Sequence, residues 1–505
     1  MISTYEELIA DSRFAFMHGR YNEALRFAKL AIEQDPKSSD AYQCAGNAYM
    51  SFEDYKSAIE QYRKAVENDA DNGDRYFNLG YAYATDNQPV RALEMFAKAD
   101  EVGCSPNVVG QLYKIMAMLC FDMHRYNDAI LNFIKSERII GIDMDVLQRK
   151  AISYSMSGDT SAGIEVANQM KLLAPTDYLG YRIAFNILLQ EERLEEAQKE
   201  LDRAERFAKP SKDLFMDWIA YEMACYQLDH DRAHLNTAID KVYDGLCILE
   251  PSVEAVIDSY VTAADLYVQL EDEDMALRCL NAAENPIYAF NSGFSVKVVP
   301  ELEVKGEGRP SERQIDHAIQ SVRRKYGDRR LEVMGRELTS KAKKSATNTD
   351  SMTPVAEQPV EDIVIPKLDS SIHAEYNTDM LDRINRLYVA AYTINNDIAH
   401  IKIYASKLAN SSDPHNKYIG KYSLIKALRD EGYEKSEEEY RDFLKFLRKE
   451  MIKDPSDMMA LSLRVQCHVD LGEFDEAEKL CTLLSDEFAQ PLQEQINEAR
   501  SGGEE

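Results

Sequence analysis

The sequence predicts an all-α fold, a solenoid in which helical hairpins stack along the chain. A small residue recurs with a period of 34 or 37 residues, and such a period is typical of helix-turn-helix repeats. Only 15 prolines and 21 glycines occur among 505 residues, which argues against long disordered or all-β stretches. The recurring positions are Ala24, Ala58, Ala92, Ala129, Gly163 and Ala197.

Two consecutive units carry the pattern most completely, and aromatic residues stand at fixed distances from the small one. The second unit contains Tyr42, Ala45, Gly46, Tyr49, Ala58, Tyr62 and Ala65; the third contains Tyr76, Leu79, Gly80, Tyr83, Ala92, Phe96 and Ala99. These units resemble the tetratricopeptide repeat (TPR) family, with tyrosine in place of the tryptophan of its pattern. The resemblance implies a right-handed superhelix in which the first helix of each hairpin lines a concave groove.

About eight hairpins are expected over residues 1–290, and these form the first predicted domain. Aligned on the small residue, weaker units fall at about 5–38, 110–143, 144–177, 178–211 and 214–250, and the eighth unit, at about 257–290, fits the pattern well again. Phe185 and Tyr221 stand where the pattern wants glycine or alanine in the sixth and seventh units. We expect the helices of those two units to cross farther apart or to tilt.

A basic helix and a flexible linker are predicted at 291–378. Residues 309–344 hold eleven basic and five acidic residues, and Ser311 is a plausible N-cap. This helix has three possible interpretations: a solvated charged face, a segment that docks onto an acidic surface of this chain, or a segment that binds nucleic acid. Its basic positions are Arg323, Arg324, Lys325, Arg329 and Arg330. Residues 345–378 are rich in Ser, Thr, Pro and Asp, which favours the linker.

Helical periodicity resumes near Met380 and predicts a second, degenerate array of three hairpins over 379–490. In its last hairpin Gly472, Phe474 and Ala477 fit a TPR turn and second helix. The remaining residues, 491–505, are expected to be a frayed tail.

The charge of the chain limits its partners. Lys and Arg total 59 against 88 Asp and Glu, a net charge of −29. A general nucleic-acid binder needs the opposite field, so nucleic acid is an unlikely partner. No signal peptide or membrane-spanning run is seen, and none of the cysteines forms a C-x-x-C pair. We therefore expect a cytoplasmic protein that does not enter a membrane, with reduced thiols in its core.

Nothing in the sequence favours an enzyme, a cofactor or a metal site. Gly306-Glu307-Gly308 lacks the third glycine and the helix context of a phosphate-binding loop. Cys467 and His468 are adjacent in a predicted helix and therefore point to different faces, which favours a structural thiol beside an exposed imidazole over a catalytic pair.

The TPR resemblance places a set of candidate binding residues in the groove of the first four units, where methionine, aromatic and amide side chains suit a peptide or a partner helix. Packing against the neighbouring unit is the alternative role for each. The set is Arg13, Phe16, Met17, Gln43, Asn47, Met50, Phe77, Asn78, Tyr81, Lys114, Met118 and Phe121.

One TPR subclass grips the acidic C-terminus of heat-shock chaperones, and this chain lacks its cations. Asn47 and Asn78 have the asparagine spacing of that clamp, but its basic positions fall on Gln43, Val108 and Leu112. A carboxylate would lose its charge-assisted hydrogen bonds there. The sequence therefore predicts a non-catalytic scaffold or adaptor that binds a protein or peptide. The alternative is a peptide-sensing regulator whose solenoid changes curvature and so controls an effector.

Overall fold

The computed structural model of the chain describes residues 4–248, 252–292 and 368–502. These residues divide into two compact units, Met1–Lys209 and Pro210–Glu505. Both are built from consecutive helical hairpins, and the described residues contain no β-strand. The all-α repeat fold predicted from the sequence is confirmed.

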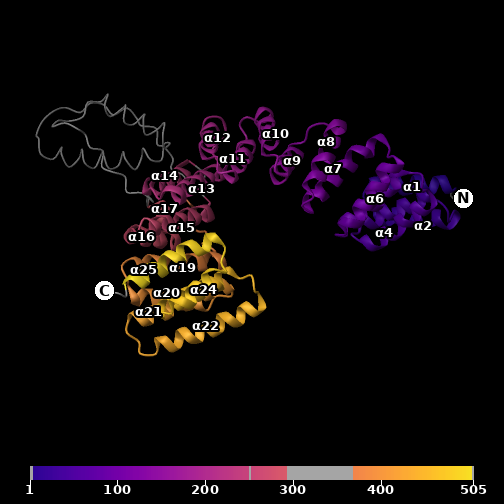
Figure 1. Ribbon diagram of the computed structural model, residues 1–505. Helices are drawn as coiled ribbons and strands as arrows, with labels where there is room; N and C mark the ends of the chain where they lie inside the picture. The colour runs from indigo at the N-terminus through magenta and orange to yellow at the C-terminus, as the bar shows by residue number, and fades with distance from the viewer. Residues whose placement is uncertain (1–3, 249–251, 293–367, 503–505) are drawn as a thin grey trace, which may run out of the picture. The chain divides into compact units, whose positions relative to one another are not determined.

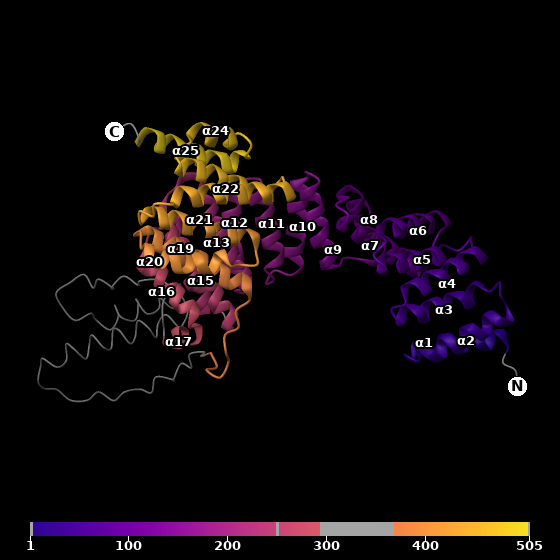
Figure 2. The same ribbon diagram turned by 90° about the horizontal axis from the view of Figure 1, so that it is seen from below.

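The first unit consists of six hairpins, whose neighbouring helices run antiparallel (Figure 1). Seen from below, the helices of each pair lie side by side, and each hairpin follows the one before it (Figure 2). The helices are α1 Tyr5–Met17, α2 Tyr21–Gln34, α3 Ser39–Ser51, α4 Tyr55–Asn68, α5 Gly73–Thr85, α6 Pro89–Val102, α7 Pro106–Asp122, α8 Tyr126–Ile140, α9 Met144–Met156, α10 Thr160–Leu173, α11 Leu179–Gln190 and α12 Leu194–Phe207.

The small residues allow the two helices of a hairpin to approach closely. A Cβ built on Gly46 in α3 would lie 2.6 Å from the Tyr62 ring of α4, and one built on Gly80 in α5 would lie 2.7 Å from the Phe96 ring of α6. Ala92 on the facing helix has no exposed surface. Each aromatic ring therefore packs directly on a helix backbone, and this contact fixes the geometry of the hairpin.

A left-handed residue makes the turn inside each hairpin of this unit. The position is held by Gly19, Glu53, Asn87, His124, Gly158 and Glu192, with φ between 56° and 90°. At each such turn the next N–H donates to a carbonyl five residues back, as in Arg125 N–H to Cys120 O at 2.8 Å. That hydrogen bond ends the first helix, and it imposes the left-handed conformation whatever the side chain is.

The second unit continues the hairpin pattern. Its helices are α13 Lys212–Asp229, α14 Arg232–Ile248, α15 Val253–Gln269, α16 Glu273–Glu284, α17 Pro286–Asn291, α19 Thr378–Ile394, α20 Ile398–Ala409, α21 Pro414–Asp430, α22 Ser436–Lys453, α23 Met458–Asp470, α24 Phe474–Cys481 and α25 Asp486–Gly502. The three C-terminal hairpins expected after residue 379 are present as α19–α24.

Helix α19 packs against α15 and α16, so the two halves of this unit share one core. Tyr376 donates to the carbonyl of Ala283 at 2.7 Å, and the Leu368 N–H donates to the Asn291 side chain at 2.9 Å. The domain boundary predicted at residue 290 therefore falls inside this unit, because the apolar face of α15 and α16 is covered by α19.

The sequence predicted a frayed tail for residues 491–505, and a helix occupies the described part of that segment, 491–502. Helix α25 extends to Gly502, and its Leu492 and Ile496 pack on α23 and α24. Pro491 lies in the interior of α25, a position that ordinarily disfavours a helix. The apolar residues spaced four apart outweigh it.

Among the described cysteines, Cys44, Cys120, Cys225, Cys279, Cys467 and Cys481 are buried free thiols, and Cys104 is a partly buried one. The predicted basic helix, with Arg323, Arg324, Lys325, Arg329 and Arg330, lies outside the described residues. No described helix is both long enough and apolar enough to cross a membrane.

Candidate functional site

The predicted groove residues fall into rows that follow the repeat. Arg13, Asn47, Tyr81 and Met118 lie 34, 34 and 37 residues apart, on α1, α3, α5 and α7. Repeat-equivalent residues occupy equivalent places on stacked hairpins, so these four form a line along the first helices. Gln43, Phe77 and Lys114 form a second row, and Phe16, Met50 and Phe121 a third. We call these three rows, with Met17 and Asn78 beside them, the groove face.

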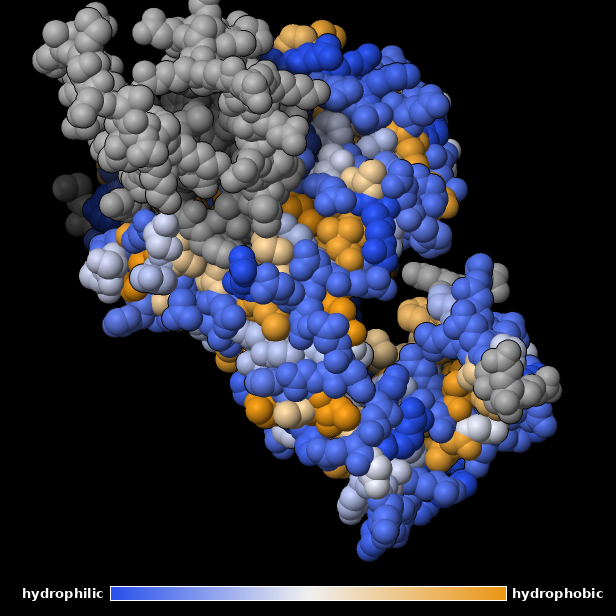
Figure 3. All heavy atoms as spheres, turned by 90° about the vertical axis from the view of Figure 1, so that its left-hand side faces the viewer, coloured by the Kyte–Doolittle hydropathy of each residue, from blue (hydrophilic) through white to orange (hydrophobic). Residues whose placement is uncertain are grey.

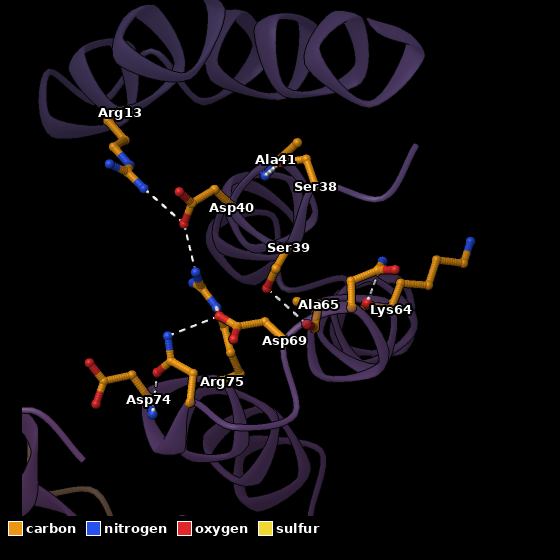
Figure 4. A network of polar contacts seen from close by, with 12 residues as sticks. Arg13, Ser38, Ser39, Asp40, Ala41, Lys64, Ala65, Asp69, Asp74 and Arg75 are labelled. Carbon is orange, nitrogen blue, oxygen red and sulfur yellow. Dashed lines mark hydrogen bonds and ion pairs between the residues drawn. The ribbon is translucent and has the colours of Figure 1, made fainter. Parts of the chain in front are cut away.

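Ion pairs connect the first three hairpins beside this face (Figure 4). Asp40 at the start of α3 forms an ion pair with Arg13 of α1 at 3.1 Å and accepts a hydrogen bond from Arg75 of α5 at 2.6 Å. Arg75 also contacts Asp69 at 3.3 Å, and its side chain is only 11% exposed. A guanidinium held by two carboxylates has a defined position, so the charges connect neighbouring hairpins rather than remaining free for a ligand.

The amide of Asn47 has a fixed orientation. Tyr62 of α4 donates its hydroxyl proton to Asn47 Oδ1 at 2.6 Å. Burial, together with the neighbouring Cys44 and Tyr81, raises the pKa of Tyr62 well above its ordinary 10.0, so the donor stays protonated. Because Oδ1 is occupied, the Nδ2 group is the part of the Asn47 amide left to donate to a ligand.

One turn earlier on α3, Gln43 holds an unsatisfied acceptor. Its Oε1 atom is buried and has no hydrogen-bond partner among the described residues. An acceptor left in that state costs free energy, because water is excluded and nothing replaces it. The groove face therefore contains an oriented donor and an unpartnered acceptor on successive turns of one helix.

Apolar and aromatic side chains make up much of the rest of the groove face. Met17 is 74% exposed and Tyr81 is 47% exposed. The Tyr81 ring stacks on Phe77 at 6.4 Å between centroids, and Phe121 meets Tyr126 edge-on at 5.9 Å. On the face drawn in Figure 3, apolar residues lie in separate patches among polar ones.

The ammonium of Lys114 is already paired with the carboxylate of Asp143. Its Nζ lies 2.5 Å from Asp143 Oδ2, and this hydrogen bond lowers the pKa of the Asp143 carboxyl. Asp40, Arg75 and Tyr62 are the residues that sequence reasoning missed. The candidates were chosen by their repeat position on the first helix of each hairpin. Asp40 and Arg75 lie in the first turns of such helices and Tyr62 lies on a second helix, so none of the three was at a chosen position.

No three described His, Cys, Asp or Glu side chains come together in a way that could hold a metal ion. The described part of the site is therefore one of hydrogen-bonding amides, aromatic rings and methionines.

A profile of the TPR repeat family matches residues 46–87, which run from within α3 through α4 to the end of α5 and include Gly46, Tyr62 and Gly80. The chain contains tetratricopeptide repeats. The resemblance read from the sequence is thereby confirmed, and the matched residues include Gly46 with the Tyr62 ring that packs on it, and Gly80. No curated protein sequence matches this chain.

Several solved structures are partly similar to this chain. YrrB, described as a TPR protein with an unusual peptide-binding site, is 21% identical, with 35% of this chain and 90% of that chain covered and a TM-score of 0.31. The C-terminal part of a TPR repeat-containing protein from Cytophaga hutchinsonii is 14% identical, and the match covers 50% of this chain and 98% of that chain with a TM-score of 0.39. A chain of the Naa15/Naa10 complex bound to HypK-THB is 12% identical, and the match covers 95% of this chain and 68% of that chain with a TM-score of 0.39.

Proposed function

We propose that the protein is a non-catalytic scaffold or adaptor that binds a peptide or a partner helix on the groove face of its first four hairpins. Stacked helical repeats offer an extended surface on which successive units contact successive parts of one ligand. The TPR fold supports a role in protein–protein interaction.

The observation that carries the proposal is the pair of amides on α3. Tyr62 orients Asn47, and the buried Oε1 of Gln43 lacks a partner among the described residues. A peptide backbone supplies both complementary groups, a carbonyl for Asn47 Nδ2 and an N–H for Gln43 Oε1. Because Oε1 has no exposed surface in the free protein, the partly exposed Gln43 side chain would rotate on binding so that a peptide N–H reaches this acceptor.

The neighbouring rows supply contacts for side chains of the ligand. Met17, Met50 and Met118 are unbranched and adaptable, so they can pack against apolar residues of different shapes. Tyr81, already stacked on Phe77, offers a rigid aromatic surface with little conformational entropy to lose. We infer that the preferred ligand is a segment with apolar side chains rather than a highly charged one.

The test presents the full-length chain with a displayed library of random peptides and measures the affinity of the enriched sequences by calorimetry. Asn47→Ala removes the oriented donor and is expected to weaken binding about fivefold to tenfold, the worth of one hydrogen bond. Asn22→Ala changes an exposed asparagine on the second helix α2 and serves as the matched control.

Enriched peptides that bind Asn47→Ala and Asn22→Ala equally well would place the binding surface elsewhere and overturn the proposal. Small-angle scattering on the same complexes addresses the alternative function. A change in the radius of gyration on peptide binding would favour the peptide-sensing regulator, whereas an unchanged radius would favour the scaffold.

A further inference from the structure

Between α22 and α23 of the second unit, an arginine lies against a side chain that cannot neutralise its charge. Arg464 of α23 is partly buried, and its Nη1 group donates to the sulfur of Met451 in α22 at 3.4 Å. Its Nε atom is buried and has no hydrogen-bond partner among the described residues. A thioether is an uncharged and weak acceptor, so Met451 provides the guanidinium with no counterion.

The same repeat position in the first unit shows which group is missing. Lys150 of α9 follows Glu137 of α8 by 13 residues, as Arg464 follows Met451, and each cation is the seventh residue of its helix. There the Lys150 ammonium lies 2.6 Å from a carboxylate oxygen of Glu137, and both side chains are largely buried. Equivalent positions on helical hairpins have equivalent surroundings, so Met451 stands where α8 has its carboxylate.

Arg448 adds a second positive charge beside Arg464. It lies three residues before Met451, hence on the same face of α22, and it is exposed. Burial, and then the charge of Arg448, lowers the pKa of Arg464 below its ordinary value. No described carboxylate pairs with either guanidinium, and the nearby Glu450 has both oxygens on Lys453, at 2.8 and 2.9 Å. Because charges removed from water are normally paired, this site lacks an anion.

We propose that Arg448 and Arg464 bind the phosphate of a phosphorylated serine or threonine in a partner protein. A phosphomonoester carries about −1.5 to −2 charges at pH 7, so one such group neutralises both guanidiniums, whereas a carboxylate neutralises only one. Of the Arg464 nitrogens only Nε is both buried and unpartnered, so Nη2 keeps exposed surface through which it can donate together with Arg448. The site is separate from the groove face and does not depend on the function proposed there.

A phosphate carried by a protein chain suits this surface better than free phosphate does. Arg448 is exposed rather than enclosed, and Ile452, one turn after it on α22, is 78% exposed. Ile452 can contact an apolar residue next to the phosphorylated one, whereas inorganic phosphate gains nothing from it. Recognition of phosphorylated segments by clustered arginines is a recurring mode of protein–protein interaction.

The test presents the full-length chain with three versions of one peptide library, which differ only in a central phosphoserine, glutamate or serine. Calorimetry gives the affinity of each enriched sequence in all three versions, and inorganic phosphate is titrated in parallel. We expect sequences whose phosphoserine version binds about tenfold more tightly than the glutamate version and more tightly still than the serine version. Inorganic phosphate should bind more weakly and compete with them. Sequences held by the groove face bind alike in all three versions, which distinguishes the two sites.

Met451→Glu is the sharpest variant, because it gives α22 the carboxylate found at the equivalent position of α8. It should slow hydrogen exchange in α22 and α23 while weakening phosphoserine binding about tenfold or more, so the loss cannot come from unfolding. Arg448→Gln should also weaken binding about tenfold. Arg441→Gln is the matched control on α22. Its guanidinium already pairs with Glu437 and Glu473, at 2.8 and 3.1 Å, so the affinity should not change.

The absence of any sequence that prefers its phosphoserine version would overturn the proposal, as would equal affinity for the phosphoserine and glutamate versions. Phosphoserine binding that Met451→Glu and Arg448→Gln leave unchanged would place the phosphate elsewhere and overturn it too. Inorganic phosphate that binds as tightly as every phosphoserine peptide would assign the site to a free anion instead of a protein partner.

Discussion

Replacing Gly80 with alanine sets two physical effects against each other in the best-defined hairpin of the first unit. Alanine is favoured over glycine in the middle of a helix by about 1 kcal/mol, so helix propensity alone predicts a more stable protein. The packing predicts the opposite. A Cβ at this position would lie 2.7 Å from the Phe96 ring and 3.2 Å from the carbonyl oxygen of Ala92.

The magnitude follows from how little room the hairpin has. Phe96 and Ala92 are both fully buried, so the ring can move away only by displacing other core atoms. Overpacking of this kind costs about 1–3 kcal/mol. After subtraction of the propensity gain, we expect Gly80→Ala to destabilise α5 and α6 by about 1 kcal/mol.

The assay is amide hydrogen exchange of the full-length chain, because long repeat arrays do not unfold as one cooperative unit. Exchange in peptides that cover α5 and α6 gives the local free energy of opening. Gly245→Ala is the matched control of opposite sign, since its Cβ makes only an ordinary contact with Phe215 at 3.4 Å. It should slow exchange in α14.

A double-mutant cycle separates the clash from other causes. Phe96→Leu shortens the ring side chain and should relieve the contact, so Gly80→Ala should cost less in that background than in the native one. Additive effects of the two substitutions, or a Gly80→Ala protein that exchanges more slowly than the native one, would refute the reasoning.

Three further predictions concern other parts of the first unit. Tyr62→Phe removes the hydroxyl that holds Asn47 and should lower the local stability of α3 and α4 by about 1 kcal/mol in hydrogen exchange, and an unchanged exchange rate would contradict it. Glu200→Ala leaves the ammonium of Lys171 buried without the carboxylate that lies 2.6 Å from it, and should cost about 3 kcal/mol in the same assay; a loss under 1 kcal/mol would show that water reaches the lysine. Burial, with a smaller contribution from nearby aspartates, raises the pKa of Cys104 from 9.0 to about 11, so iodoacetamide should label it slowly at pH 9 and rapidly near pH 11. Because the folded state holds this proton more tightly, the associated stability is present below pH 9 and lost as the pH rises toward 11.

The sequence predicted the hairpins because their period is imposed by packing. Gly46 and Gly80 must be small where a ring from the facing helix crosses them, and this requirement repeats every 34 residues. The turns were less visible. Gly19 and Gly158 mark two of them, but Glu53 and Glu192 adopt the same left-handed conformation, since the hydrogen bond that closes each turn determines it.

The candidate site was predictable only in part. Repeat position alone identifies the Asn47 and Tyr81 row. It does not show that Tyr62 orients Asn47 or that Arg75 bridges two hairpins, because these contacts join residues of different helices and depend on side-chain directions. The helical tail was missed for a related reason. Leu492 and Ile496 stabilise α25 because they pack on α23 and α24, and a contact between separate helices cannot be seen in the local sequence.

The arginine and aspartate contacts between the first three hairpins limit how this array could be lengthened or shortened. Asp40 belongs to one hairpin and Arg75 to the next, while Arg13 comes from the hairpin before. A 34-residue module inserted between Asn68 and Asp69 would carry Arg75 away from Asp40 and leave a largely buried guanidinium with Asp69 alone. The hairpins therefore share one backbone geometry but carry different charged residues. The ion pairs between Arg13, Asp40 and Arg75 form only when these three hairpins follow one another in this order.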